Sequence, residues 1–245
     1  MNITIVGAGA LGNMLATKLS RNNNVKLIVK KRHTGLIENQ EILFKDIDGN
    51  IIKSKINIGT DIENCDLIIL CVKSYDTQIL IQKLSSLDTP ILLCQNGLKT
   101  MNYALKNIDE KRLSYLVTGN GISKIKAGIS EHRGLGFTYL GNLSESKSNL
   151  LQNISKNLKE EGMDCSIVEN IEEFVWLKTV INSAINPIAT LAEVKNGKLK
   201  NPELNDEVKK LCEESSKIAY SNGIKLPLDP WKEINKIIEK TADNK

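Results

Sequence analysis

Apolar and polar positions follow a strand-and-helix pattern in the first part of the chain. Short runs of aliphatic and β-branched residues have the length and composition of strands buried in a parallel sheet. They occur at residues 2–6, 25–29, 67–72 and 90–94. The first run is followed by Leu11, Leu15 and Leu19, and a spacing of four residues is typical of one helix face. A strand followed directly by a helix predicts an α/β fold for this part of the chain.

The pattern changes in the second half. Between residues 114 and 141, short β-rich pieces are broken by glycines, which predicts antiparallel strands that close the far edge of the same sheet. Beyond residue 150 the strand signals stop and a helical pattern takes over. We therefore expect an α/β domain over residues 1–168 and an all-α domain over residues 169–245. A length of 245 residues suits one large domain or two modest ones.

The link between the first strand and the first helix is rich in glycine. It comprises Gly7, Ala8, Gly9, Ala10, Leu11 and Gly12, the G-x-G-x-x-G pattern of dinucleotide-binding turns. The first glycine permits the tight turn, the second lets a pyrophosphate approach the backbone, and the third lets helix and strand pack closely. A purely structural turn is the alternative. The strand before and the helix after favour a dinucleotide whose phosphates rest on the helix N-terminus.

The residues after the second run bear on the choice of dinucleotide. A carboxylate there would hold the ribose 2′-hydroxyl of NAD, whereas this chain has Lys30, Lys31 and Arg32. Because cations attract a 2′-phosphate, we expect NADP (NADPH) as cofactor and Lys30 as the main phosphate contact. A solvated basic turn after an edge strand is the alternative. The position about 20 residues after the glycines favours the cofactor interpretation.

Two further polar residues follow the third and fourth runs. Lys73 comes after the third run and Asn96 after the fourth. Ligands of open α/β sheets bind at the carboxyl ends of the strands, so both residues are expected at the cofactor site. A solvated lysine and a simple Asn-Gly turn are the alternatives. Their occurrence at successive strand ends favours the functional interpretation.

A polar stripe marks the apolar helix predicted over residues 171–187. Lys178, Asn182 and Asn186 recur every four residues and therefore share one face. Apolar neighbours should lower the pKa of Lys178 toward a value useful for an acid, and the two carboxamides can bind a polar small molecule. A surface helix with a solvated stripe is the alternative. Pro187 is expected to break or kink this helix.

Composition excludes several classes of protein. The chain has 33 basic and 29 acidic residues, a net charge of +4 and only 4% aromatic residues, which argues against a nucleic-acid partner. No apolar run approaches the roughly 18 residues of a membrane span. The N-terminus lacks a basic segment and glycines interrupt its first apolar run, so we do not expect a signal peptide. We therefore expect a cytoplasmic protein with no membrane partner.

Cysteine and histidine content argues against a metal site. The chain has two histidines and five cysteines, and no cysteine pair has the C-x-x-C spacing. Reduced thiols are the expected state. His132 lies among Glu131, Arg133 and glycines in what should be a hairpin, so we do not expect it to be catalytic.

Taken together, these motifs resemble the ketopantoate reductase (2-dehydropantoate 2-reductase) family. The resemblance covers residues 1–197 in order. It rests on GAGALG, Lys73 in CVKSYDT, Asn96 in QNG, VTGNG, HRGLGFTYLG, the pattern W-x-K-x3-N-x3-NP and Asn196-Gly197. It implies a Rossmann dinucleotide-binding domain followed by an all-α domain, and reduction of the C2 ketone of 2-dehydropantoate by NADPH to (R)-pantoate, a precursor of coenzyme A.

The resemblance also assigns roles to individual residues. Lys178 would be the proton donor. Asn182, Asn186 and Asn196 would hold the substrate, a small-molecule 2-oxo acid, and Asn96 would lie between substrate and cofactor. Lys30 and Lys73 would lie near the 2′-phosphate, with residues 7–12 as the phosphate turn. A homodimer through the helical domain is a further expectation.

Three alternatives stay open at this point. The first is an NADP-dependent reductase of another 2-oxo acid, the second a non-catalytic NADP(H)-sensing module, and the third, less favoured, a scaffold protein. Family chains continue beyond the position of Lys245, so the resemblance implies an incomplete helical domain. We then expect uncovered apolar surface at Trp231, Ile234, Ile237 and Ile238.

Overall fold

The computed structural model describes residues 1–144 and 149–243, which form two compact units. The first unit comprises Met1–Gln95 and Lys99–Ile171, and the second comprises Asn96–Leu98 and Glu172–Lys245. The expectation of an incomplete helical domain concerns the end of the chain, and the last two residues, Asn244 and Lys245, lie outside the described residues.

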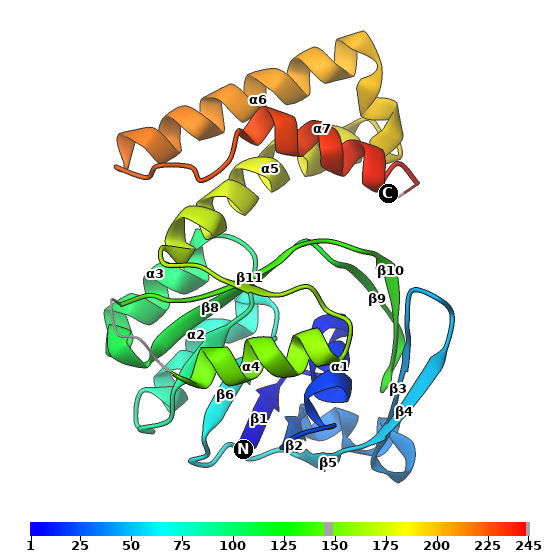
Figure 1. Cartoon of the computed structure of the whole chain (residues 1–245), viewed down its shortest axis with the longest axis vertical. Helices are drawn as coiled ribbons and strands as arrows, with labels where there is room; N and C mark the ends of the chain where they lie inside the picture. The colour runs from blue at the N-terminus through cyan, green and yellow to red at the C-terminus, as the bar shows by residue number, and fades with distance from the viewer. Residues whose placement is uncertain (145–148, 244–245) are drawn as a thin grey trace. The chain divides into compact units, whose positions relative to one another are not determined.

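The first unit is built on a main sheet (Figure 1). In the described part of the chain it has eight strands, in the order β12 (Ser166–Ile167), β11 (Thr138–Asn142), β8 (Leu113–Thr118), β7 (Ile91–Leu93), β6 (Leu67–Leu70), β1 (Asn2–Val6), β2 (Asn24–Ile28) and β5 (Asn57–Gly59). All neighbouring strands are parallel except β8 and β11, which pair antiparallel. The central strands β6 and β7 are buried at every position, as their aliphatic composition predicts for strands covered on both faces.

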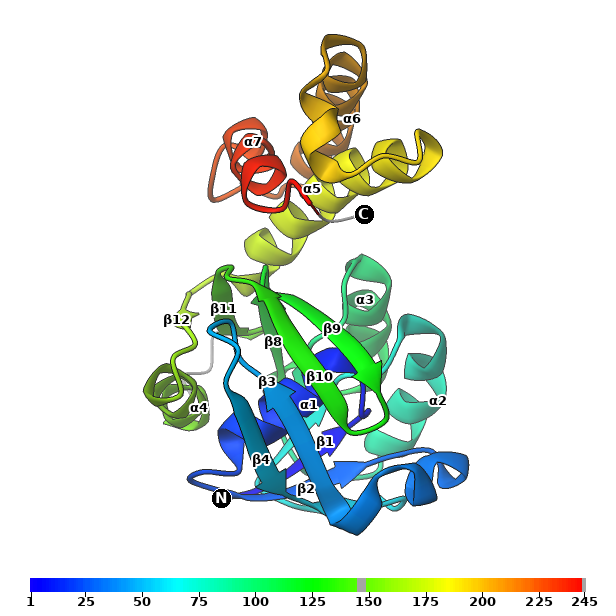
Figure 2. The same cartoon turned by 90° about the vertical axis from the view of Figure 1, so that its right-hand side faces the viewer.

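Helices cover the main sheet on both faces (Figure 2). On one face lie α1 (Ala10–Leu19), α4 (Asn149–Glu160) and a second, smaller sheet; on the other lie α2 (Ser74–Leu84) and α3 (Leu98–Asn107). Short 3-10 helices η1 (Lys31–Leu36), η2 (Glu38–Gln40) and η3 (Glu110–Arg112) connect the elements. The core on the α1 side includes Ile3, Ile5, Met14, Leu15, Leu27, Phe44 and Ile154.

The second sheet corrects one expectation. It has the strand order β4 (Ile51–Lys55), β3 (Glu41–Lys45), β10 (Ile129–Gly134) and β9 (Gly121–Lys126). Of the strands expected over residues 114–141, β8 and β11 do join the main sheet, but the β9–β10 hairpin leaves it and pairs in parallel with β3. The reason is burial: Ile42 and Phe44 of β3 are fully buried in the core that includes α1. The hairpin therefore extends a sheet that already has an apolar face.

Two short strands extend the main sheet beyond those predicted. Strand β2 is not an edge strand, as the alternative interpretation of the basic turn assumed, because β5 pairs with it along Lys26–Ile28. Strand structure does not stop at residue 150 either, since β12 pairs with β11. Both added strands are only two or three residues long, too short to show an alternating pattern.

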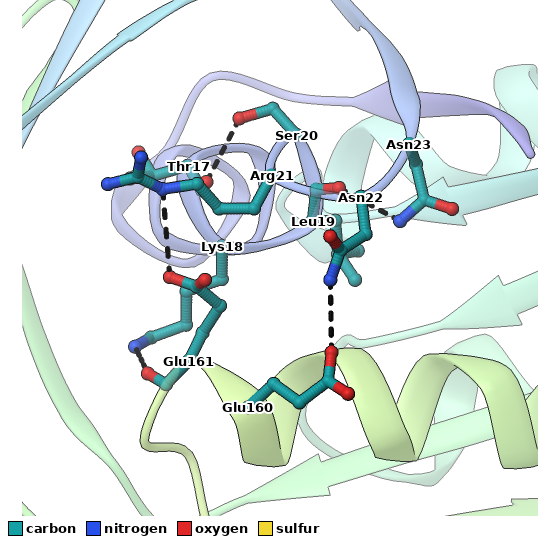
Figure 3. A network of polar contacts seen from close by, with 9 residues as sticks. All are labelled: Thr17, Lys18, Leu19, Ser20, Arg21, Asn22, Asn23, Glu160 and Glu161. Carbon is teal, nitrogen blue, oxygen red and sulfur yellow. Dashed lines mark hydrogen bonds and ion pairs between the residues drawn. The ribbon is translucent and has the colours of Figure 1, made fainter.

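Polar contacts fix the C-terminal end of α1 to the end of α4 (Figure 3). Lys18 Nζ donates to the carbonyl oxygen of Glu161 at 2.5 Å, and Asn22 Nδ2 donates to the Glu160 carboxylate at 3.0 Å. Arg21 forms a longer ion pair with the Glu161 carboxylate, at 3.9 Å. The helix whose N-terminus follows the glycine turn is thus anchored at its other end.

The second unit is helical. It contains α5 (Ile171–Leu191), η4 (Asn196–Lys200), α6 (Pro202–Ser221) and α7 (Pro230–Lys240). Asn201 caps α6 and Asp229 caps α7 through their side chains, and each helix begins with proline, a residue favoured at that position because its missing N–H costs nothing there. The core combines residues of all four elements: Leu177, Val180, Ile181, Ala184, Ile185, Leu199, Val208, Cys212, Ile234 and Ile238.

The structure bears on two expectations about this unit. Of the break or kink expected at Pro187, the break is wrong, because α5 continues to Leu191. Proline removes one backbone hydrogen bond, and the buried Ala184, Ile185 and Ala189 around it keep the helix packed. The expected uncovered surface on α7 is also wrong. Ile234 and Ile238 are fully buried, and Trp231 and Ile237 pack against the same core. Within the described ranges, no helix is long and apolar enough to cross a bilayer.

Candidate functional site

The glycine turn lies at the carboxyl end of β1. Gly7 has φ +114°, a conformation that L side chains rarely adopt, and its N–H donates to the carbonyl oxygen of Ile28 at 3.0 Å. Gly12 lies in the first turn of α1, where an added Cβ would collide with the carbonyl oxygen of Gly7. These two positions therefore need glycine for the turn and for the close approach of helix to strand.

Gly9 differs from Gly7 and Gly12 because the space beside its backbone is open. It caps α1 with φ −82°, and no atom of the described residues other than Gly9 itself and its chain neighbours lies within 4 Å of the position of an added Cβ. Among the residues that the structure describes, no side chain caps the helix with a hydrogen bond, and the first turn of the helix holds no acidic residue. Ala8, Ala10 and Leu11 are only half-buried. An open helix N-terminus beside a glycine backbone fits the pyrophosphate of a dinucleotide.

The strand order places this turn at a topological switch point. From β1 the chain first continues to β2 on one side, then returns to β6 on the other. An added Cβ on Gly7 would come within 3.0 Å of the backbone of Cys71 and Val72, so the segments after β1 and β6 are in contact. In open α/β sheets ligands bind at this point. Lys73 lies at the end of the segment that follows β6, where it is the exposed N-cap residue of α2.

Lys30 lies two residues beyond β2 and is exposed. Its Nζ pairs with Asp76 Oδ1 at 2.9 Å and lies 5.9 Å from the centre of the Tyr75 ring. Asp76 is in the first turn of α2, and Tyr75 is 76% exposed. Sequence reasoning missed both residues. The available signal was an aromatic and an acidic residue at the start of the helix that follows Lys73.

The segment after β7 carries Asn96. This residue is exposed, and the Asn96–Leu98 segment is grouped with the second unit. Gln95 just before it is buried, and its side-chain amide has no hydrogen-bond partner among the residues that the structure describes. The Gln95 carbonyl oxygen accepts a hydrogen bond from the Tyr115 hydroxyl. The end of β7 thus holds polar groups that a ligand could use.

The second unit brings three predicted residues together on one helix. Lys178, Asn182 and Asn186 occupy successive turns of α5; Lys178 and Asn182 are half-buried, and Asn186 is exposed. Burial lowers the pKa of Lys178 to about 8, because a poorly solvated ammonium group loses its charge more easily. Near neutral pH such a lysine is still largely protonated and is a stronger acid than an ordinary lysine.

Asn196 lies elsewhere in the second unit, at the start of η4. Its Nδ2 donates to Thr241 Oγ1 at 2.9 Å, and the neighbouring Gly197 N–H donates to the carbonyl oxygen of Ala242 at 3.0 Å. The structure thus places Asn196 against the segment that follows α7. Its predicted role in substrate binding stays a prediction.

His132 has a structural partner. Its Nε2 lies 2.9 Å from Asn120 Oδ1 in the β9–β10 region. Burial, and secondarily the nearby Lys18 charge, lower the pKa of His132. Among the residues described, no group of three or more His, Cys, Asp or Glu side chains could hold a metal ion.

The family of the chain follows from comparison with known proteins. A family profile described as ketopantoate reductase PanE/ApbA matches residues 3–145, and the profile of the C-terminal part of that family matches residues 170–245. The chain belongs to the ketopantoate reductase family. It is therefore an oxidoreductase with a Rossmann-type α/β unit followed by a helical unit.

Individual relatives agree with this membership. A 2-dehydropantoate 2-reductase of Pyrococcus horikoshii is 30% identical over 248 residues, covering 100% of this chain and 82% of the relative. The solved PanE/ApbA family ketopantoate reductase from Ralstonia eutropha superposes with a TM-score of 0.85 at 23% identity, covering 99% and 82% of the two chains. D-mandelate dehydrogenase with NADH and anilino(oxo)acetate superposes with a TM-score of 0.83 at 23% identity, covering 99% and 79%. These structures share the fold of this chain.

Proposed function

We propose that this protein reduces 2-dehydropantoate to (R)-pantoate with NADPH. Membership of the family and the names of relatives such as the Pyrococcus horikoshii protein support the reaction. The observation that carries the proposal is the lowered pKa of Lys178, about 8, on a helix that also bears Asn182 and Asn186. A proton donor and two carboxamides on one face suit a small oxo acid.

The residues of the first unit fit the proposed cofactor. The open space at Gly9 and the uncapped N-terminus of α1 accept a pyrophosphate. Lys30 and Lys73 are exposed cations that follow β2 and β6, where a 2′-phosphate would need positive charge. When bound, NADPH supplies the hydride that adds to the C2 carbon of the substrate.

Lys178 completes the reduction. As the carbon–hydrogen bond forms, the carbonyl π electrons move to the oxygen, and the Lys178 ammonium gives that oxygen a proton. The neutral amine then regains a proton from water. A pKa of about 8 makes this proton easier to give than that of an ordinary lysine.

Carboxamides would orient the substrate. Asn182 and Asn186 on α5, together with Asn196 and Asn96, can each donate to a carboxylate and accept from a hydroxyl. We place Asn96 beside both the cofactor and the substrate, as the family resemblance implies. A homodimer through the second unit also stays a prediction.

A second candidate is reduction of another 2-oxo acid. The observation in favour of this candidate is the fold shared with D-mandelate dehydrogenase, which was solved with anilino(oxo)acetate. The shape of the substrate pocket would separate the two substrates, because the reaction at the ketone is the same.

The test is NADPH oxidation, followed at saturating NADPH with 2-dehydropantoate and with a series of other 2-oxo acids. We expect Lys178→Ala to lower kcat/KM by about 10²–10⁴-fold while the Kd of NADPH stays unchanged. Lys209→Ala is the matched control, because Lys209 is an exposed lysine on α6. An unmodified protein that binds NADPH but reduces no 2-oxo acid would instead be a sensing module.

A further inference from the structure

The ion pair between Lys30 and Asp76 crosses the end of β1. Lys30 follows β2, Asp76 lies on the helix that follows β6, and β1 lies between β2 and β6 in the sheet (Figure 1). The pair therefore joins the two segments that flank the glycine turn. Any dinucleotide bound at that turn would place its adenosine ribose near the end of β2, and hence near this pair.

Asp76 supplies an acid that β2 itself lacks. The residues at the end of β2 are the cations Lys30, Lys31 and Arg32, so no carboxylate follows that strand directly. The Asp76 carboxylate instead reaches the same place from α2, with Oδ1 at 2.9 Å from Lys30 Nζ. A carboxylate at this location is the group that accepts hydrogen bonds from a ribose diol.

The pair is exposed enough to open. The Lys30 side chain is 48% exposed and that of Asp76 is 26% exposed, and ion pairs of this kind contribute little to stability. Lys30 can therefore exchange Asp76 for a phosphate at small cost. The same carboxylate has two oxygens that accept hydrogen bonds, so it can bind a hydroxyl while it remains beside Lys30.

We propose that Asp76 is a cofactor-specificity residue that admits NADH alongside NADPH. With NADH, its carboxylate accepts a hydrogen bond from the ribose 2′-hydroxyl. With NADPH, Lys30 turns to the 2′-phosphate, and the nearby Asp76 charge opposes that phosphate. This inference rests on the proposed function only in that the chain binds a nicotinamide dinucleotide.

The experiment measures the Kd of NADPH and of NADH by calorimetry, without turnover. In Asp76→Asn we expect NADPH to bind about fivefold more tightly and NADH about fivefold more weakly, the effect of one charge at close range in water. Asp76→Glu keeps the charge and should keep the ratio of the two Kd values near that of the unmodified protein. Glu63→Gln is the matched control, because Glu63 also pairs with a lysine, Lys26 at 3.1 Å. It should leave both Kd values within about twofold.

Several outcomes would overturn the inference. NADH that does not bind the unmodified protein contradicts it, as does an Asp76→Asn variant whose two Kd values move together or not at all. In these cases NADPH binding and ketone reduction stand, so the proposed function survives. If neither cofactor binds the unmodified protein, the proposed function fails as well. A melting temperature for each variant shows whether it is folded.

Discussion

The glycine turn and the polar face of α5 carry the proposed chemistry in opposite ways. At the turn, the chain supplies backbone N–H groups and open space, and Gly12 is needed because any side chain there would collide with Gly7. On α5, the chain supplies side chains, Lys178 above all, on a helix whose core residues lie elsewhere on its surface. The glycine turn therefore depends on the lack of side chains, whereas the polar face of α5 depends on the side chains that it carries.

This difference determines what substitutions can reveal. A glycine that permits close packing belongs to the fold and to the site at once, so its replacement damages both. A half-buried side chain on a helix packed by other residues can be removed with little effect on folding. Three predictions test this contrast, in order of decreasing expected effect.

Gly12→Ala should have the largest effect. Its Cβ would meet the backbone of Gly7, which cannot move without shifting β1, and overpacking of this kind costs about 3 kcal/mol. Urea unfolding followed by circular dichroism measures the free energy of unfolding. An unchanged midpoint would show that the turn can relax, and the contrast between the two regions would not hold.

The activity should fall at high pH because Lys178 must be protonated to act as donor. With a pKa of about 8, the lysine loses its proton as the pH rises above that value, and kcat/KM should fall about tenfold per pH unit. A pH profile of kcat/KM for the 2-oxo acid measures this decrease, because kcat/KM depends on the protonation state of the free enzyme. Lys178→Arg keeps its proton throughout, so any residual activity should show no such decrease. A flat profile for the unmodified protein would contradict the proposed role.

Gly9→Ala should have the smallest effect and should act on binding alone. Gly9 has negative φ and open space around its Cβ position, so the variant should unfold at the same urea concentration as the unmodified protein. The added methyl group would occupy the space left for the pyrophosphate and raise the Kd of NADPH about tenfold. Calorimetry checks the affinity. A clear loss of stability would mean that this glycine, like Gly12, belongs to the fold.

Local patterns allowed the first strand, the glycine turn and α5 to be predicted. A strand, three glycines and a leucine spacing of four lie within twenty residues, and the spacing of Lys178, Asn182 and Asn186 follows from helix geometry alone. The second sheet could not be predicted in the same way. The parallel pairing of β10 with β3 joins segments that are distant in the sequence. The residues within either segment do not indicate which other strand it pairs with.

The same limit applies to the candidate site. The basic residues after β2 predict a site for phosphate, but the partner of Lys30 comes from α2, far along the chain. Asn196 likewise bonds to Thr241 beyond α7. The break expected at Pro187 does not occur, because a proline is recognised locally, whereas the packing that preserves the helix comes from α6 and α7.

The pairing of Leu43 with Ile129 has a consequence for synthesis on the ribosome. The β3–β4 hairpin is made early, but its partner strand β10 emerges only after most of the main sheet has been translated. Until then β3 has an unpaired edge, and unpaired edges invite association with other chains. Slowing translation between residues 55 and 121 would therefore lengthen the period in which the nascent chain is exposed to aggregation.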